Sequence, residues 1–159
     1  MTAQAAKSEI RKLFDGTIPT WGSVYERLYE IGGELPPKWD PSFFDHPIHV
    51  AVHEAAKQIC IHRMTALLPM IIAFSMHWCE TDGEGILRLA VQRGWVWGVK
   101  TAIAAGCARV GCESEMGKCL STKYIKADED TRDHADCVQL MMEYEAQFKW
   151  KQPTACCCR

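Results

Sequence analysis

The stretch DGEGILRLAVQRGWVWGVKTAIAAGCARV, residues 82–110, carries the clearest structural pattern in this chain. Its acidic and Gly-rich opening is typical of a turn, and a short apolar run follows over 86–91. Arg93 and Gly94 end that run, and a second apolar run over 96–105 ends at Gly106. Glycine adopts the left-handed conformation that closes a helix without a Cβ clash. The stretch therefore predicts helices over 86–93 and 96–105, joined by a tight turn.

This unit resembles an ankyrin repeat, a helix–turn–helix motif with a period of about 33 residues. The positions that agree with the family pattern, or lie one step from it, are Leu87, Ala90, Gly94, Val99, Ile103, Gly106 and Ala108. Three positions depart from it, because Gly85, Ile86 and Arg88 stand where the family has Thr, Pro and His. Trp95 also replaces the His that follows the mid-repeat Gly. A repeat architecture requires further copies along the chain.

A second copy lies upstream, where HPIHVAV at 46–52 resembles the family's Thr-Pro-Leu-His-x-Ala-Ala run. Pro47 falls at the first helical position, where a missing N–H costs nothing. The resemblance gives His49 a structural role, which is to bond backbone at the turn. Ala51 and Ala90 are equivalent but lie farther apart than one ordinary repeat, so we expect lengthened helices within 55–75. Pro69 should begin the second of these helices or kink it.

Weaker copies lie at both ends of the chain. Residues 24–33 resemble the second helix and Gly stop of a first repeat, and helices near 118–126 and 134–147 would form a last one. A Pro-rich connector over 34–45 should be extended with bends. The predicted fold is all-α, an ankyrin-like α-solenoid of three to four irregular repeats. Its expected parts are an N-terminal capping helix within 1–18, a degenerate ankyrin-repeat domain over 19–150 and a flexible Cys-rich tail over 151–159.

Composition and charge are those of an ordinary soluble domain. The chain has 159 residues, of which 48% are hydrophobic and 24% charged, and its net charge of −2 would attract neither nucleic acid nor an anionic membrane. We find no secretory signal and no apolar run of about 18 residues. The nine cysteines are an odd number, which favours a reducing compartment, cytoplasmic or nuclear. Cys107 is expected to be buried as a small hydrophobe.

Catalytic motifs are absent from the sequence: it contains no G-x-S-x-G and no P-loop. No cofactor is therefore expected. The resemblance implies a non-catalytic protein–protein interaction module, an adaptor or scaffold that binds another protein through its concave face and turn tips. On the clearest repeat we expect this role for the side chains of Glu84, Arg88, Gln92, Arg93 and Trp95. Trp95 and Trp97 bracket Val96, so at most one of them can be fully buried, and the exposed one would anchor a partner.

Two alternatives belong to other classes of protein. A thiol- or metal-dependent protein would use His49 and His53, which are spaced i, i+4, with Cys60 and the C-terminal cysteines. A zinc site needs three or more ligands, so we favour structural roles for the histidines and predict no metal site. A membrane-tethered adaptor would instead be S-acylated on Cys156, Cys157 and Cys158, since two acyl chains give stable anchoring.

Overall fold

A computed structural model describes residues 1–78, 84–107, 136–137, 139–140 and 142–143 of the chain. In this part of the chain the secondary structure is helical and contains no strand, so the predicted all-α class is confirmed. The chain divides into two compact units, Met1–Glu80 and Thr81–Arg159. Each unit is described by itself below.

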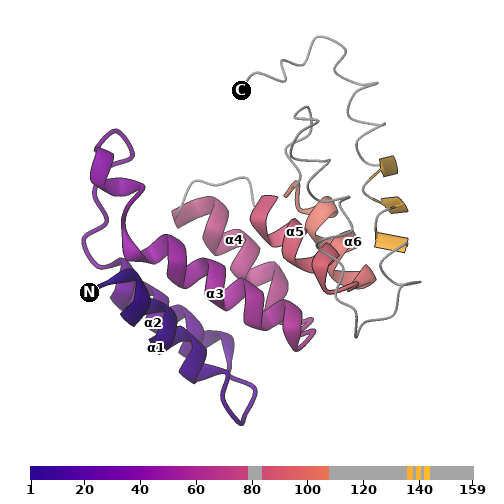
Figure 1. Ribbon diagram of the computed structural model, residues 1–159, viewed down its shortest axis with the longest axis horizontal. Helices are drawn as coiled ribbons and strands as arrows, with labels where there is room; N and C mark the ends of the chain where they lie inside the picture. Colours follow the sequence, from indigo (N-terminus) through magenta and orange to yellow (C-terminus); the bar gives the residue numbers. More distant parts are fainter. Residues whose placement is uncertain (79–83, 108–135, 138, 141, 144–159) are drawn as a thin grey trace. The chain divides into compact units, whose positions relative to one another are not determined.

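The first unit contains four α-helices and a short 3₁₀-helix (Figure 1). Thr2 and Thr20 cap the first two helices, because their side-chain oxygens accept hydrogen bonds from the backbone N–H of Ala5 and Ser23. The helices are α1 (Ala3–Leu13), α2 (Trp21–Gly32), the 3₁₀-helix η1 (Pro41–Phe43), α3 (Pro47–Ile61) and α4 (Leu68–Trp78). The connector predicted to be extended over 34–45 therefore holds a helical turn.

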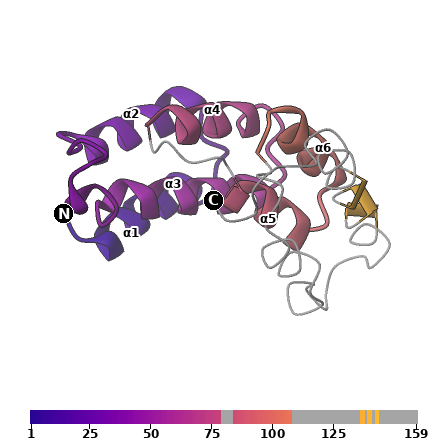
Figure 2. The same cartoon turned by 90° about the horizontal axis from the view of Figure 1, so that it is seen from above.

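The helices of this unit lie in two layers, with α1 beside α3 in one and α2 beside α4 in the other (Figure 2). The core is apolar: Ala6 and Ile10 of α1, Val24 and Leu28 of α2, and Ile59 of α3 are all fully buried. α3 packs against α1, α2 and α4, so burial of this apolar surface holds the helices of the first unit together.

The helix ends lie where proline and glycine predict them. Gly33 closes α2 with a positive φ of 42°, and its N–H donates to the carbonyl of Tyr29. Pro47 is the first residue of α3 and Pro69 is the second residue of α4. Pro69 was predicted either to start its helix or to kink it, and it lies at the start. Proline is tolerated there because the first N–H groups of a helix have no partner within it.

The second unit contains α5 (Glu84–Gln92) and α6 (Val96–Ala104), which pack against each other. Gly94 and Gly106 have φ of +61° and +80°, so both predicted glycine stops are confirmed. Leu87 of α5 and Val99 of α6 are buried, and Cys107 is buried as predicted. The described residues of 136–143 are helical, within the helix predicted near 134–147. The helix predicted near 118–126 and the tail over 151–159 lie outside the described residues.

No helix in the described ranges has the length and apolar character needed to cross a membrane.

Candidate protein-binding surfaces

The side chains predicted to bind a partner on the second unit differ in exposure. Trp95 is only 4% exposed, and Trp97 is 43% exposed. The indole of Trp95 lies directly over Gly98, where an added Cβ would come within 2.5 Å of the ring. Trp95 therefore belongs to the core and its selection as a contact residue is corrected, because a buried ring offers no surface to a partner. Of the two tryptophans, Trp97 is the available one.

The polar residues of that prediction lie nearby on α5 and the following turn. Arg88, Gln92 and Arg93 are half-buried, and Glu84 is the first residue of α5. Half-buried arginine stems can cover apolar surface while the charged heads reach water. These residues remain a predicted contact set, now with Trp97 in the place of Trp95.

A second surface lies in the connector between α2 and α3, residues 33–46, which we call the aromatic loop. Asp40 organises its centre, since one carboxylate oxygen accepts from the backbone N–H of Ser42 at 3.0 Å and from its hydroxyl at 2.9 Å. These two hydrogen bonds lower the pKa of Asp40, which keeps the acceptor charged. The hydrogen bonds form the cap of η1 and give the loop a defined backbone.

Two histidines fasten the aromatic loop to α3. Nδ1 of His46 accepts the backbone N–H of Ile48 at 3.1 Å, so His46 caps α3 where the family has Thr. Nε2 of His49 lies 2.6 Å from the carbonyl oxygen of Phe43, which can only accept, so Nε2 carries the proton. The structural role predicted for His49 is confirmed. Burial, with the nearby His49 and the N-terminal charge, lowers the pKa of His46 and favours the neutral ring that the cap needs.

The loop holds one aromatic side chain inside and presents two outside. Phe43 is buried, and its ring meets those of Phe44 and His49 edge-on at centroid distances of 5.2 and 5.0 Å. Trp39 is 83% exposed and Phe44 is 67% exposed. A large aromatic side chain that stays in water does not gain the stabilisation that its burial would give. Two such side chains on a hydrogen-bonded loop make this loop a candidate contact surface.

A third surface follows the seam between α2 and α4. Five aromatic rings meet there, and we call them the aromatic ladder. Tyr25 and Tyr29 stack at 6.1 Å along α2, and Phe74 and Trp78 stack at 5.2 Å along α4. Edge-on contacts join the two helices, at 5.8 Å from Tyr25 to Phe74 and at 5.3 Å from Tyr29 to Trp78. Trp21 completes the ladder through contacts with Tyr25 and Phe74.

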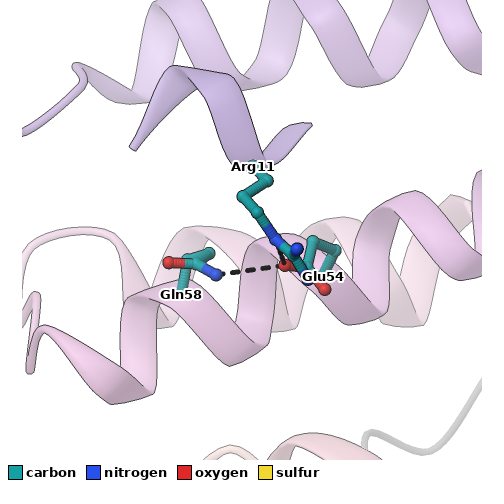
Figure 3. A network of polar contacts seen from close by, with 3 residues as sticks. All are labelled: Arg11, Glu54 and Gln58. Carbon is teal, nitrogen blue, oxygen red and sulfur yellow. Dashed lines mark hydrogen bonds and ion pairs between the residues drawn. The ribbon is translucent and has the colours of Figure 1, made fainter. Parts of the chain in front are cut away.

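A buried carboxylate fixes α1 against α3 (Figure 3). Oε1 of Glu54 accepts from Nε of Arg11 at 3.0 Å and from Nε2 of Gln58 at 3.0 Å. Burial raises the pKa of Glu54, but the hydrogen bonds from Gln58 and Arg11, with the charges of Arg11 and Lys57, outweigh it and leave the pKa below its ordinary value. The network holds one helix to another and has the geometry of a structural contact.

The structure describes three residues of the metal-binding alternative, His49, His53 and Cys60, and not its C-terminal cysteines. His53 lies on the exposed side of α3, and Cys60 is fully buried in the same helix. Across the described ranges, no three His, Cys, Asp or Glu side chains lie close enough to hold an ion. The cysteines 156–158 of the acylation alternative lie outside the described residues.

Sequence reasoning did not single out Trp39, Phe44, Tyr25 or Tyr29. A signal was present for the first two, since three aromatic residues in the short connector at 39–44 are unusual for a solvated loop. Comparison of the chain with protein-family models, with curated proteins and with solved structures finds no match.

Proposed function

We propose that this protein is a non-catalytic protein–protein interaction module, an ankyrin-like stack of helix pairs that binds a partner protein through the aromatic loop. The observation that carries the proposal is the exposure of Trp39 and Phe44, at 83% and 67%, on a loop whose backbone is held by hydrogen bonds. In the ankyrin-like arrangement this loop joins the first helix pair to the second, so it stands at a turn tip.

Preorganisation is the physical reason to favour binding at this loop. A loop that is already ordered loses little conformational freedom when a partner docks, so more of the contact free energy contributes to affinity. The Asp40 cap and the His49 hydrogen bond supply that order. Trp is enriched among the residues that dominate interface energetics, where truncation costs about 2 kcal/mol or more. Trp39 is therefore the proposed anchor, with Phe44 beside it.

The charge of the loop favours a protein partner over a lipid surface. Residues 34–45 carry three acidic side chains and a single lysine. An anionic membrane would repel this surface. A protein with an apolar pocket and a basic rim fits it, because opposite charges at a rim speed association and set orientation.

The test is a comparison of three forms of the full chain as bait in an extract of the source cells, with captured proteins quantified by mass spectrometry. The test variant is Trp39→Ala with Phe44→Ala. The matched control is Ile18→Ala, which removes another exposed large apolar side chain, 76% exposed, from the loop between α1 and α2. We expect proteins that the parent chain and the control retain and that the test variant loses by about tenfold or more.

Stability provides the internal check on this comparison. Trp39 and Phe44 are mostly exposed, so their truncation should change the free energy of unfolding by about 0.5 kcal/mol or less. Far-UV circular dichroism in urea measures this change. Capture of the same proteins by all three forms would contradict the proposal, provided that the test variant is folded.

A further inference from the structure

The outward face of α4 is unusual for a surface helix, because α4 contains no Asp, Glu, Lys or Arg. Helices at a protein surface ordinarily turn charged and polar side chains to water. Here Met70 is 42% exposed, and Pro69, Ala73 and His77 are also exposed. The outer side of this helix is therefore apolar except for one imidazole.

The adjoining edge of α2 continues this apolar surface. Tyr25 is 40% exposed and Tyr29 is 55% exposed, although both also pack in the aromatic ladder. Their edge-on contacts with Phe74 and Trp78 of α4 hold the two rings in place. Contiguous exposed apolar surface of this kind marks interaction sites in soluble proteins.

The charged side chains beside this surface are acidic. Glu26 and Glu30 are both exposed and stand one helical turn apart on α2, next to the tyrosines. The one Lys or Arg of α2 is Arg27, which contacts Glu9 of α1 at 3.4 Å and Glu30 at 3.5 Å. α2 and α4 are wholly described, and their carboxylate and guanidinium side chains are Glu26, Glu30 and Arg27, which together carry a net charge of −1, with Arg27 in contact with Glu30.

We propose that this α2–α4 surface is a second binding site, and that its ligand is an amphipathic helix with a basic edge from a partner protein. The surface has the features that a bound helix needs. Tyr25 and Tyr29 form one row at i, i+4 spacing, and Met70 and Ala73, followed by the imidazole of His77, form another along α4. A third helix docks between two such rows with apolar residues at i, i+3 and i+4. Lysines or arginines along its edge pair with Glu26 and Glu30.

The same charges make other occupants worse fits. Phosphates of a lipid or a nucleic acid would meet two carboxylates and be repelled. A second copy of the chain would bring an identical patch to this surface, because a two-fold interface uses the same residues on both sides. Each copy would then bring a net charge of −1 to the interface, because Arg27 compensates only one of the two carboxylates on α2. A basic helix removes that repulsion.

The experiment measures binding of synthetic 18-residue helical peptides to the full chain by fluorescence anisotropy. One peptide has a leucine face and lysine edges. A second keeps the leucine face and has glutamate edges, and a third has the composition of the first with the leucines scattered around the helix. We expect the first peptide to bind at least tenfold more tightly than either of the others.

Variants assign the binding to this surface. Tyr25→Ala with Tyr29→Ala should weaken binding of the lysine peptide by about tenfold or more, since aromatic contacts dominate interfaces. Glu26→Gln and Glu30→Gln should each weaken it by about two- to fivefold, the value of an exposed ion pair, and the loss should shrink in high salt. Asp15→Asn is the matched control, an exposed acid in the loop after α1, and should have no effect.

Three results would overturn the proposal. The first is equal binding of the lysine and glutamate peptides. The second is binding that the tyrosine and glutamate variants leave unchanged while circular dichroism shows them folded. The third is concentration-dependent dimerisation of the chain that Tyr29→Ala abolishes, because a second copy would then occupy the surface. Variants of the aromatic loop leave this assay unaffected, so the outcome is separate from that of the function proposed above.

Discussion

Removing Arg11 should destabilise the first unit more than removing the carboxylate that it contacts. Glu54 is almost fully buried, whereas the Arg11 side chain is 51% exposed. In Arg11→Ala the buried carboxylate keeps only the hydrogen bond from Gln58 and loses its counter-charge. A hydrogen bond to a charged group contributes about 1.5–3 kcal/mol, and the exposure of Arg11 places the expected loss near the lower end.

Glu54→Leu removes the buried charge together with its desolvation cost. Leucine has a similar volume and suits an apolar surrounding, and Arg11 and Gln58 can both turn to water. Replacing a buried ion pair by apolar groups is often neutral or stabilising. We therefore expect Glu54→Leu to cost less than Arg11→Ala at pH 7, although it alters the more buried residue.

The pH dependence of the two variants tests the electrostatic part of this reasoning. The folded chain lowers the pKa of Glu54 below 4.5, so the unfolded chain binds the proton more readily. This stabilisation is present above pH 4.5 and is lost as the pH falls through the folded pKa. The cost of Arg11→Ala should therefore shrink between pH 7 and pH 3.5. Glu54→Leu removes the titrating carboxyl, so its cost should shrink as well, by the stabilisation that Glu54 loses in the parent chain.

Urea denaturation followed by far-UV circular dichroism gives the free energies, and hydrogen exchange of the α1 and α3 amides assigns the loss to this unit. The reasoning is refuted if Glu54→Leu costs more than Arg11→Ala at pH 7. It is also refuted if the cost of Arg11→Ala does not change with pH.

Two further predictions concern the ends and the contacts of helices. The lowered pKa of His46 means that its contribution to stability is complete above pH 6.5 and is lost as the pH falls toward the folded pKa. His46→Asn keeps a capping acceptor and should remove this loss of stability between pH 7.5 and 5.5, whereas His46→Ala should cost about 1 kcal/mol at pH 7.5. Urea titrations at both pH values measure the free energies of unfolding. An unchanged pH dependence in His46→Asn would contradict the role of the His46 imidazole. An added Cβ at Gly32 would lie 2.8 Å from the Trp78 ring, so Gly32→Ala should cost about 1–3 kcal/mol. Gly22→Ala on the same helix meets nothing closer than 3.8 Å and should instead stabilise by about 0.5–1 kcal/mol, so equal effects of the two substitutions would contradict the packing argument.

The helix boundaries could be predicted because local chemistry decides them. Gly94 and Gly106 take positive φ at the ends of α5 and α6, a conformation that carries a steric cost for any residue with a Cβ. Pro47 begins α3 for an equally local reason, since its missing N–H has no partner in the first turn. The preference of glycine and proline for these positions does not depend on how the rest of the chain packs.

The exposure of Trp95 and Trp97 could not be predicted from their own positions, because both flank the start of α6. Gly98 decides between them: it lacks a Cβ and leaves room for the Trp95 ring directly above its backbone. The spacing of Trp95 and Gly98 is present in the sequence, but a glycine three residues later indicates a ring contact only once the helix is known to begin at Val96.

The aromatic ladder required tertiary information as well. The i, i+4 spacing of Trp21, Tyr25 and Tyr29 predicts a row of rings along α2, yet it does not say whether a neighbouring helix covers that row. Only the pairing of α2 with α4 shows that Phe74 and Trp78 cover one side and leave the tyrosines half in water. Partial exposure of this kind depends on the relation of two elements that are distant in sequence.

The exposed aromatic side chains and the buried polar contacts of the first unit have a common physical basis. Leaving Trp39 and Phe44 in water costs stability that a purely structural loop would recover by turning them inward. Phe43 does turn inward, and the His49 hydrogen bond holds its carbonyl, so the same loop places one ring in the core and two outside. The His49 hydrogen bond and the Asp40 cap order the backbone from which Trp39 and Phe44 extend into water. The proposed binding role depends on this order, because an ordered loop loses little conformational freedom when a partner docks.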